Sequence, residues 1–452
     1  MKTRIPPVLI IFALVCVALV QNAQAVVPAP DGGYPGANTA EGDNALLNVN
    51  TAIGINNTAV GDNALRDDTT GYYNVAIGSG ALANNTTGNF NMAIGTDALT
   101  NSNANFNVAV GFRVLFMNTT GNHLTGLGAA ALRNNTTGGF NTAIGADALK
   151  ENTTSSGNTA IGADALSKNT TGSSNTATGD LALFNNTTGN DNTATGDSTL
   201  AGNTSGYQNT ANGFEALLNN ITGFGNTASG LQALLFNSSG IYNTADGFRA
   251  LQNNTTGQRN IALGADAGSE IITANNVIAI GIAGADVSNT CFIGHIRGVT
   301  TGNANAIPVL IDSAGQLGTA SSSRRFKREV KPMDKASEAI LGLKPVTFAY
   351  KSDDTATPQF GLIAEEVAAV NPDLVVRDEN GEIYTVRYDA VNAMLLNEFL
   401  KEHGKVAKLE AIVAQQHKDF EAAVAELKGQ IQKVRAQLEL SKPAAQTVLN
   451  KR

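Results

Sequence analysis

A short pattern of small and polar positions recurs along most of the chain and predicts the architecture of that part. The pattern Asn-x-Ala-x-Gly, with few variants, returns every 17 residues apart from one step of 16, and leucine follows the glycine by four residues in twelve repeats. The glycines that end the fourteen repeats are Gly61, Gly78, Gly95, Gly111, Gly128, Gly145, Gly162, Gly179, Gly196, Gly213, Gly230, Gly247, Gly264 and Gly281. A unit this short cannot bury its own apolar face, so neighbouring units must stack.

Alternation within the pattern predicts a strand in each repeat. In residues 141–145, Ala143 points to one face of a strand, while Thr142 and Ile144 point to the other. Seventeen residues leave room for short strands and tight turns but not for a pair of helices, and Gly and Asn suit such turns because both tolerate positive φ. We therefore expect a mainly β fold, a parallel β-roll or β-helix with coils about 4.8 Å apart.

The two faces of the expected strand differ in character. The central position is alanine in nearly every repeat, whereas the position after it is Ile or Val early, polar in the middle (Asn212, Ser229, Asp246) and Leu263 or Ile280 at the end. Because a dry face would not hold Asp246, we expect the middle of the rod to face water and its apolar ends to contact partner chains. Each coil buries little apolar area, so we also expect the repeats to gain stability from trimerisation.

After residue 295 the repeat ends and other patterns predict a small α+β region. The expected elements are strands within 306–318, a short helix over 335–341, a strand over 346–350, a helix over 362–370 that ends before Pro372, and a hairpin over 373–388. The hairpin is expected to turn at Asn380-Gly381 in a type I′ turn.

Heptad spacing follows in the last part of the chain. Apolar residues recur every seven positions, and a second set follows four positions later; together they are Phe399, Val406, Val413, Phe420, Val424, Leu427, Ile431, Val434 and Leu438. This spacing predicts a coiled coil, and the alternative is one amphipathic helix packed on its own domain. His403 and His417 fall on the same stripe, where they would be tolerated polar positions that fix the register.

Charge marks the boundary between these regions. Residues 26–321 carry 8 Lys/Arg and 19 Asp/Glu, whereas the 131 residues from 322 onward carry 20 and 19. At the start, Lys2 and Arg4 precede an apolar run over 8–20 that ends in Ala23-Gln24-Ala25, which is typical of a secretory signal peptide. Its removal would leave Cys291 as the sole cysteine, so no intrachain disulfide is expected.

We therefore divide the chain as follows: signal peptide 1–25, lead-in 26–50, β-solenoid repeats 51–295, β connector 296–321, a small α+β domain 322–400, coiled coil 401–442 and tail 443–452.

Several features of the repeats invite a binding-site interpretation that their regularity disfavours. Asn-x-Thr triplets such as Asn85-Thr86-Thr87 fall on the repeat's own turn, and acidic residues such as Asp62 and Asp147 suit solvated corners. His123 and His295 are isolated, so we predict no metal site. We expect no cofactor, no nucleic-acid partner and no membrane span once the signal is removed.

The junction at 320–327, Ala-Ser-Ser-Ser-Arg-Arg-Phe-Lys, holds a serine and a lysine five residues apart, Ser322 and Lys327. Five residues place them on opposite faces of a strand and some 140° apart around a helix, so they can meet only through a turn or across chains. Spacing alone favours a solvated basic face over catalysis.

The junction and the motifs after it resemble the intramolecular chaperone of endosialidase tailspikes. The resemblance covers residues 320–400 and implies a chaperone and self-cleavage domain over 322–400. It rests on 322–327 (Ser-Ser-Arg-Arg-Phe-Lys), 341–346 (Leu-Gly-Leu-Lys-Pro-Val), 348–350 (Phe-Ala-Tyr), 359–367 (Gln-Phe-Gly-Leu-Ile-Ala-Glu-Glu-Val) and 386–388 (Val-Arg-Tyr). It departs from the family at Ser323, where the family often has Asp. The resemblance implies that three chains trimerise, and that Ser322 is the nucleophile and Lys327 the base that break the bond between Ser321 and Ser322.

The sequence thus predicts an exported, trimeric surface fibre, an adhesin or tail-fibre-like protein that binds a surface glycan or another cell-surface ligand and carries a self-cleaving chaperone. The only enzymatic activity expected is this self-processing. Two alternatives stay open. One is a polysaccharide-degrading fibre, which needs two carboxyl groups about 5 to 9 Å apart. The other is a single-chain solenoid whose threonine-rich face binds ice or a repetitive polymer.

Overall fold

The computed structural model describes residues 34–297, 299–302, 306–312, 315–378 and 380–441. The predicted signal peptide, the first part of the lead-in and the predicted tail lie outside these residues. The described residues form two compact units, which divide after Thr300. Each unit is described by itself.

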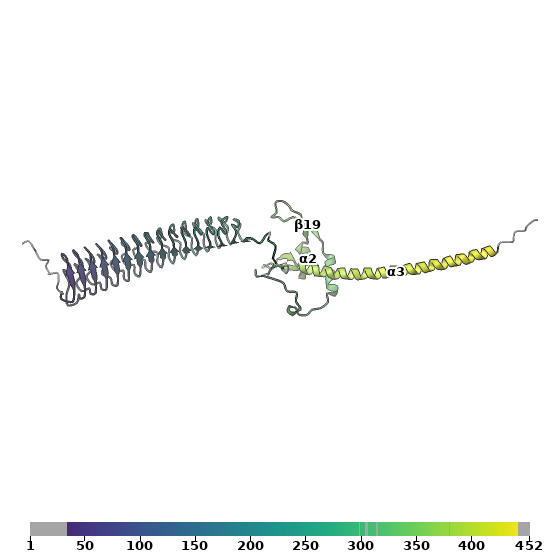
Figure 1. The fold of residues 1–452 in the computed structure, drawn as a ribbon, viewed down its shortest axis with the longest axis horizontal. Coiled ribbons are helices and arrows are strands. Elements are labelled where there is room, and N and C mark those ends of the chain that lie inside the picture. The colour runs from purple at the N-terminus through teal and green to yellow at the C-terminus, as the bar shows by residue number, and fades with distance from the viewer. Residues whose placement is uncertain (1–33, 298, 303–305, 313–314, 379, 442–452) are drawn as a thin grey trace, which may run out of the picture. The chain divides into compact units, whose positions relative to one another are not determined.

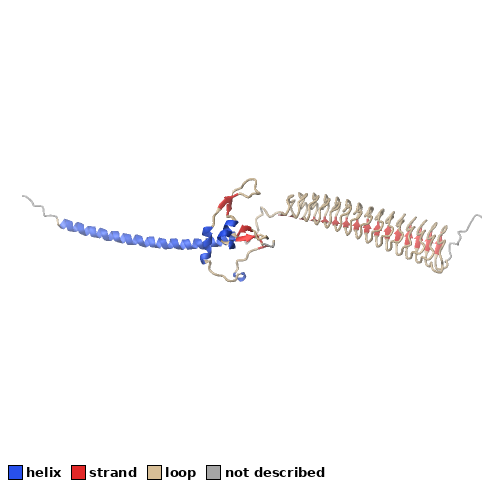
Figure 2. Ribbon diagram, turned by 180° about the vertical axis from the view of Figure 1, so that it is seen from behind, coloured by secondary structure: helices blue, strands red, loops and turns tan. Residues whose placement is uncertain are grey.

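The first unit is a solenoid in which each coil contributes one short strand. The strands form one 16-stranded sheet in sequence order, and each described pairing is parallel and in register, as between Thr142–Ile144 and Thr159–Ile161. Figure 1 shows the stacked coils, and Figure 2 shows that the strands line up along one side of the stack. The predicted mainly β fold with 17-residue parallel coils is confirmed.

The strands are β1 (Thr39–Glu41), β2 (Thr58–Val60), β3 (Val75–Ile77), β4 (Met92–Ile94), β5 (Val108–Val110), β6 (Thr125–Leu127), β7 (Thr142–Ile144), β8 (Thr159–Ile161), β9 (Thr176–Thr178), β10 (Thr193–Thr195), β11 (Thr210–Asn212), β12 (Thr227–Ser229), β13 (Thr244–Asp246), β14 (Ile261–Leu263), β15 (Ile278–Ile280) and β16 (Cys291–Ile293).

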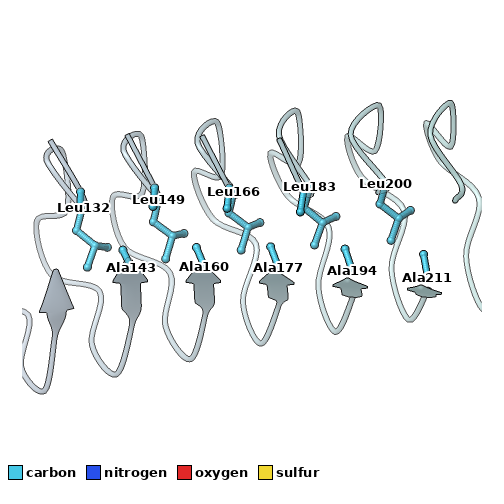
Figure 3. Packing of buried hydrophobic residues seen from close by; sticks show 14 of the residues in the cluster. Leu132, Ala143, Leu149, Ala160, Leu166, Ala177, Leu183, Ala194, Leu200 and Ala211 are labelled. Atoms are coloured by element: carbon cyan, nitrogen blue, oxygen red, sulfur yellow. The ribbon is translucent and has the colours of Figure 1, made fainter. Parts of the chain in front are cut away.

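The core of the solenoid is a row of alanines opposite a row of leucines. From β2 to β15, the central residue of each strand is an inward, buried alanine such as Ala160, except for Gly126 in β6. The leucine that follows the glycine by four residues in twelve repeats, such as Leu166, is buried against this row. Figure 3 shows both rows side by side in successive coils. Because both rows come from the same coils, the apolar core of the solenoid forms within one chain.

These leucines also take positive φ, in addition to the Gly and Asn for which the sequence predicts it. Leu166 has φ of 53° and Asp164 has φ of 54°, and the equivalent positions of most coils do the same. This backbone costs a non-glycine residue about 1–2 kcal/mol. It points the leucine inward and lets its N–H donate to the carbonyl of the next coil, as Leu166 does to Ala182 at 3.0 Å, so burial and hydrogen bonding offset the strain.

Two buried rows of polar side chains join the coils. In the first row the asparagine that opens the pattern accepts, through its side-chain oxygen, the backbone N–H of the next one, as Asn158 does from Asn175 at 2.9 Å. In the second row side chains bond one another, as Asn186 does to Asn169 at 2.9 Å. These bonds satisfy amides that would otherwise be costly to bury.

The second row explains the Asn-x-Thr triplets. The asparagines of these triplets, such as Asn85 and Asn220, are fully buried, and the oxygen of Asn85 accepts the N–H of Gly88 at 3.0 Å inside its own turn. A glycosylated side chain must face solvent, so the interpretation of these residues as turn formers is confirmed.

The second unit contains three small antiparallel pairs and five helical segments. The segments are β17 (Leu310–Ile311), β18 (Leu317–Gly318), η1 (Arg324–Phe326), η2 (Asp334–Gly342), β19 (Val346–Phe348), β20 (Gln359–Gly361), α2 (Ala364–Val370), η3 (Pro372–Leu374), β21 (Val375–Arg377), β22 (Ile383–Val386) and α3 (Tyr388–Leu440). The predicted helices and strands are present, although the segment expected as a helix over 335–341 is a 3-10 helix.

The hairpin of β21 and β22 has a longer loop than expected. Asp378 donates its N–H to the carbonyl of Glu382 at 2.9 Å, and Gly381 donates to the carbonyl of Asp378 at 3.1 Å. This pairing encloses three residues rather than the two of a type I′ turn, so the predicted turn type is wrong. The side chain of Asp378 also accepts the N–H of Glu382, which favours the wider loop.

A small core holds the second unit together. Val367, Leu374, Val375 and Val386 are buried, and residues at the start of α3 pack on them. From there α3 continues as one helix of 53 residues, so it crosses the expected boundary between chaperone domain and coiled coil without a break.

Candidate functional site

The junction lies on the exposed surface of the second unit. Ser321, Ser322 and Lys327 are all exposed, and a single 3-10 turn, η1, separates the serines from the lysine. Two backbone bonds hold this turn, from the N–H of Phe326 to Ser323 and from the N–H of Lys327 to Arg324, each of 3.0 Å. Both candidate side chains therefore flank one tight turn.

The structure does not join the two candidate side chains directly. Among the described residues, no hydrogen bond links Ser322 to Lys327. The side chain of Ser321 accepts the N–H of Ser323 at 3.4 Å, and the guanidinium of Arg325 lies 4.6 Å from the centre of the Phe326 ring. A serine–lysine dyad needs a neutral lysine, which requires burial or neighbouring positive charge. In one chain, the arginines near Lys327 supply positive charge, but Lys327 itself is exposed and not buried.

A different serine and lysine do meet, and sequence reasoning missed them. Lys401 of α3 places its Nζ 3.2 Å from the Oγ of Ser337 in η2, which is fully buried. The same Nζ lies 2.6 Å from Glu398, so this lysine is held as an ammonium in an ion pair. The serine is inaccessible and its neighbour is charged, so the pair is a structural contact and not a nucleophile with its base.

Glu398 completes this contact. Lys401 and then Ser337 bond its carboxyl group and lower its pKa against the effect of burial. The signal that sequence reasoning passed over is the spacing of Asn397, Glu398 and Lys401, which places all three on one side of a helix turn.

The second unit also has an apolar groove, lined in part by residues of η2 and α3. It has a volume of about 660 Å³, and the residues that line it include Ile340, Leu343, Val346, Phe360, Val391 and Leu395. Phe360 is 81% exposed. Side chains of this kind are rarely left in water unless another surface covers them.

The apolar stripe of α3 is exposed along its length, apart from Val424, which is partly buried. Phe399, Val413, Phe420 and Leu427 are each more than half exposed, and the stripe runs on to Leu438. The alternative of one amphipathic helix packed on its own domain would bury these residues, so their exposure favours a helix that pairs with other chains.

The solenoid surface carries threonine rows and a stack of rings, all at least partly exposed. Eight threonines lie side by side at the first strand position from β6 to β13, and Thr178 and Thr195 add a second row beside them. On a corner of the earlier coils, the rings of Phe90, Phe106, His123 and Phe140 stack at 4.8–5.2 Å between centroids.

Metal ligation and membrane spanning can be assessed in the residues that the structure describes. Within them, no group of three His, Cys, Asp or Glu side chains gathers as a metal ion would require. No helix in the same residues has the length and apolar character needed to cross a membrane. The corner carboxylates Asp62 and Asp147 are at least partly exposed, as expected.

Comparison with known protein families gives a match in one part of the chain. Residues 322–376 match the family model described as chaperone of endosialidase, Peptidase_S74. No curated protein matches the chain. The match begins at Ser322 and includes the junction, η2, the groove strands β19 and β20, and α2. These findings fit a tail-fibre-like repeat protein, because a β-solenoid of 17-residue coils is followed by a segment, residues 322–376, that is similar to the chaperone of endosialidase.

Proposed function

We propose that this protein is exported as a homotrimeric surface fibre, an adhesin, and that its chaperone domain first trimerises the chains and then cleaves before Ser322. The observation that carries the proposal is the exposed apolar stripe of α3 directly after a domain of the endosialidase chaperone family. Three helices that share such a stripe would bury it in a coiled coil.

The proposed cleavage uses groups of the junction and water. Ser322 Oγ attacks the carbonyl carbon of Ser321 while the neutral amine of Lys327 takes the hydroxyl proton. The bond from that carbon to the nitrogen of Ser322 breaks, the nitrogen receives the proton, and an ester remains. Water then hydrolyses the ester, which leaves a carboxylate on Ser321 and a free amine and hydroxyl on Ser322.

Assembly gives a reason for the timing of this reaction. The junction is exposed in one chain, and an exposed lysine is kept charged by water. When three junctions lie together, neighbouring chains would exclude water from it, and Arg324, Arg325 and Arg328 would add positive charge. Both effects favour the neutral lysine that the reaction needs.

The experiment is expression of the full chain, followed by native mass and denaturing electrophoresis. We expect a trimer and a C-terminal fragment of 131 residues that begins with Ser322. Ser322→Ala and Lys327→Ala should remain full length and trimeric, whereas Ser323→Ala, next to the nucleophile, should still be cleaved. A wild-type trimer that stays intact would refute self-cleavage, and a monomer would refute the assembly.

A second function is favoured by the threonine rows. Threonines spaced about 4.8 Å apart on a flat sheet present hydroxyl and methyl groups in a regular array, which suits ice or a repetitive polymer. Replacing Thr193 with Tyr in the middle of the array should abolish any effect of the protein on ice-crystal growth or polymer binding, while Thr51→Tyr outside the array should not. If neither wild type nor variant has an effect on these ligands, this second function is excluded.

A further inference from the structure

The first anchor of the junction to the folded second unit lies at the start of η2. Residues 319–332 are all exposed, and the hydrogen bonds described within them stay inside the segment. At Asp334 this changes, because its carbonyl accepts the Nζ of Lys401 at 2.6 Å and the side-chain N–H of Asn397 at 3.3 Å. Both donors belong to α3, so hydrogen bonds hold the start of η2 against that helix.

Ser337 links these hydrogen bonds into one network. Its hydroxyl donates to the carboxylate of Glu398 at 2.5 Å and accepts from Asn397 at 2.7 Å and from Lys401 at 3.2 Å. Ser337 is fully buried and the side chain of Glu398 is 11% exposed. Charge-assisted bonds in such a place require a specific geometry, because the Nζ of Lys401 bonds Asp334, Ser337 and Glu398 at the same time.

The distance from this network to the junction is short. Lys327 and Asp334 are seven residues apart, so the extended chain between their Cα atoms spans at most about 25 Å. The network therefore limits where Ser322 and Lys327 can lie relative to the same turn of α3, and the exposed apolar stripe begins in that turn with Phe399.

We propose that Ser337, Glu398 and Lys401 are positioning residues for the self-cleavage, which couple the junction to the assembly helix. The proposal rests on the proposed function. The three residues touch neither the bond that breaks nor the dyad. They hold the start of η2 on α3, so that helices aligned by their apolar stripes bring the tethered junctions to equivalent places. Without the network, α3 can still assemble, but the junction is no longer tethered to the turn of α3 where the apolar stripe begins.

The test measures cleavage and native mass of the full chain in matched variants. Lys401→Met and Ser337→Ala should remain trimeric and release the 131-residue fragment at least tenfold more slowly. Lys401→Arg, which keeps a charged donor, should restore much of the rate. The control is Lys405→Met, because Lys405 pairs with Glu402 one turn later, within α3 itself.

Lengthening the tether separates positioning from general damage. Inserting Gly-Ser after Lys331 leaves the network and α3 unchanged and should slow cleavage to a similar degree. Combining the insertion with Lys401→Met should slow it little further, because both changes release the same constraint. If Lys401 had a merely structural role, Lys401→Met would lower the cleavage rate further, in addition to the decrease caused by the insertion.

The outcomes separate the two proposals. If wild type is not cleaved, the proposed function fails and this inference fails with it. If wild type is cleaved and the trimeric variants and the insertion are cleaved at its rate, the positioning role alone is overturned. If Lys401→Met and Ser337→Ala no longer trimerise, the insertion decides: slow cleavage supports the tether, and an unchanged rate overturns it.

Discussion

Asn85 donates its side-chain N–H to Oδ1 of Asp68 at 2.9 Å, deep inside the solenoid. Asp68 is fully buried and occupies the place that asparagine takes in most later coils. Its Oδ1 accepts the N–H of Gly71 at 3.1 Å, as Asn85 accepts that of Gly88. The amide nitrogen of Asn85 also donates to the carbonyl of Gly88, at 3.2 Å. Asp68 can make that bond only when its carboxyl group is protonated.

This relationship predicts that the first coils lose stability as pH rises. Burial raises the pKa of Asp68 to about 7 from an ordinary value of 3.8, although bonds from Gly71 and Asn85 oppose the shift. Because the folded-state pKa lies above the unfolded one, the stabilisation is complete below about pH 4 and is lost as pH rises through about 7, by up to ~4 kcal/mol. The neighbouring Asp67 is paired with Arg66, and its pKa is lowered.

Asp68→Asn should remove this dependence and raise the unfolding temperature of the first coils at pH 8. Hydrogen exchange of residues 57–91, compared between pH 5 and pH 8, measures the pH dependence of the stability of these coils. The converse variant, Asn186→Asp, puts a carboxyl group at the same position of a middle coil and should create the dependence there. Equal pH dependence in wild type and Asp68→Asn would contradict the assignment.

Much of the solenoid could be predicted because its period is a direct consequence of stacking. The inward alanines and the parallel strands follow from a pattern in which every second residue near the glycine is small. The positive φ of leucines such as Leu166 could not be predicted, because local preference opposes it and only burial and bonds to the next coil make it favourable.

The candidate site was less accessible to sequence reasoning. Ser322 and Lys327 were singled out by resemblance, and the match that begins at residue 322 supports the domain but not their roles. The contact of Ser337 with Lys401 joins residues 64 positions apart, so no local sequence pattern predicts this contact. The exposed stripe of α3, in contrast, follows from the heptad spacing alone.

The register of the coils gives a second prediction. One residue inserted after Ala177 would turn the following inward side chains outward and break the in-register pairing of β9 with β10. A complete 17-residue unit inserted at the same place should be tolerated, because it adds one more coil with the same contacts. The folding of the two insertion variants is compared by circular dichroism and by the yield of soluble protein. Equal folding of both variants would argue against stacked coils.

The stripe of α3 gives a third prediction. Val413→Asp places a charge in the proposed interface and should convert the trimer to monomer and prevent cleavage, while the solenoid keeps its fold because its core lies within one chain. Lys428→Asp, off the stripe, is the control for a charge change on the same helix. Sedimentation of both variants measures the mass. A trimeric Val413→Asp protein would place the interface elsewhere.

The position of η1 between the serine and the lysine leads to the last prediction, that the dyad forms across chains. One 3-10 turn separates the two residues in each chain, and no hydrogen bond joins them among the described residues. Ser322→Ala and Lys327→Ala should each abolish cleavage alone. When the two variants are expressed together, mixed trimers pair an intact Ser322 with an intact Lys327 of a neighbour, so part of the 131-residue fragment should return. Differently tagged chains show by mass spectrometry that mixed trimers form and that the released fragment carries intact Ser322. If mixed trimers form and no fragment appears while wild type is cleaved, the dyad must close within one chain, through a rearranged turn at 324–326.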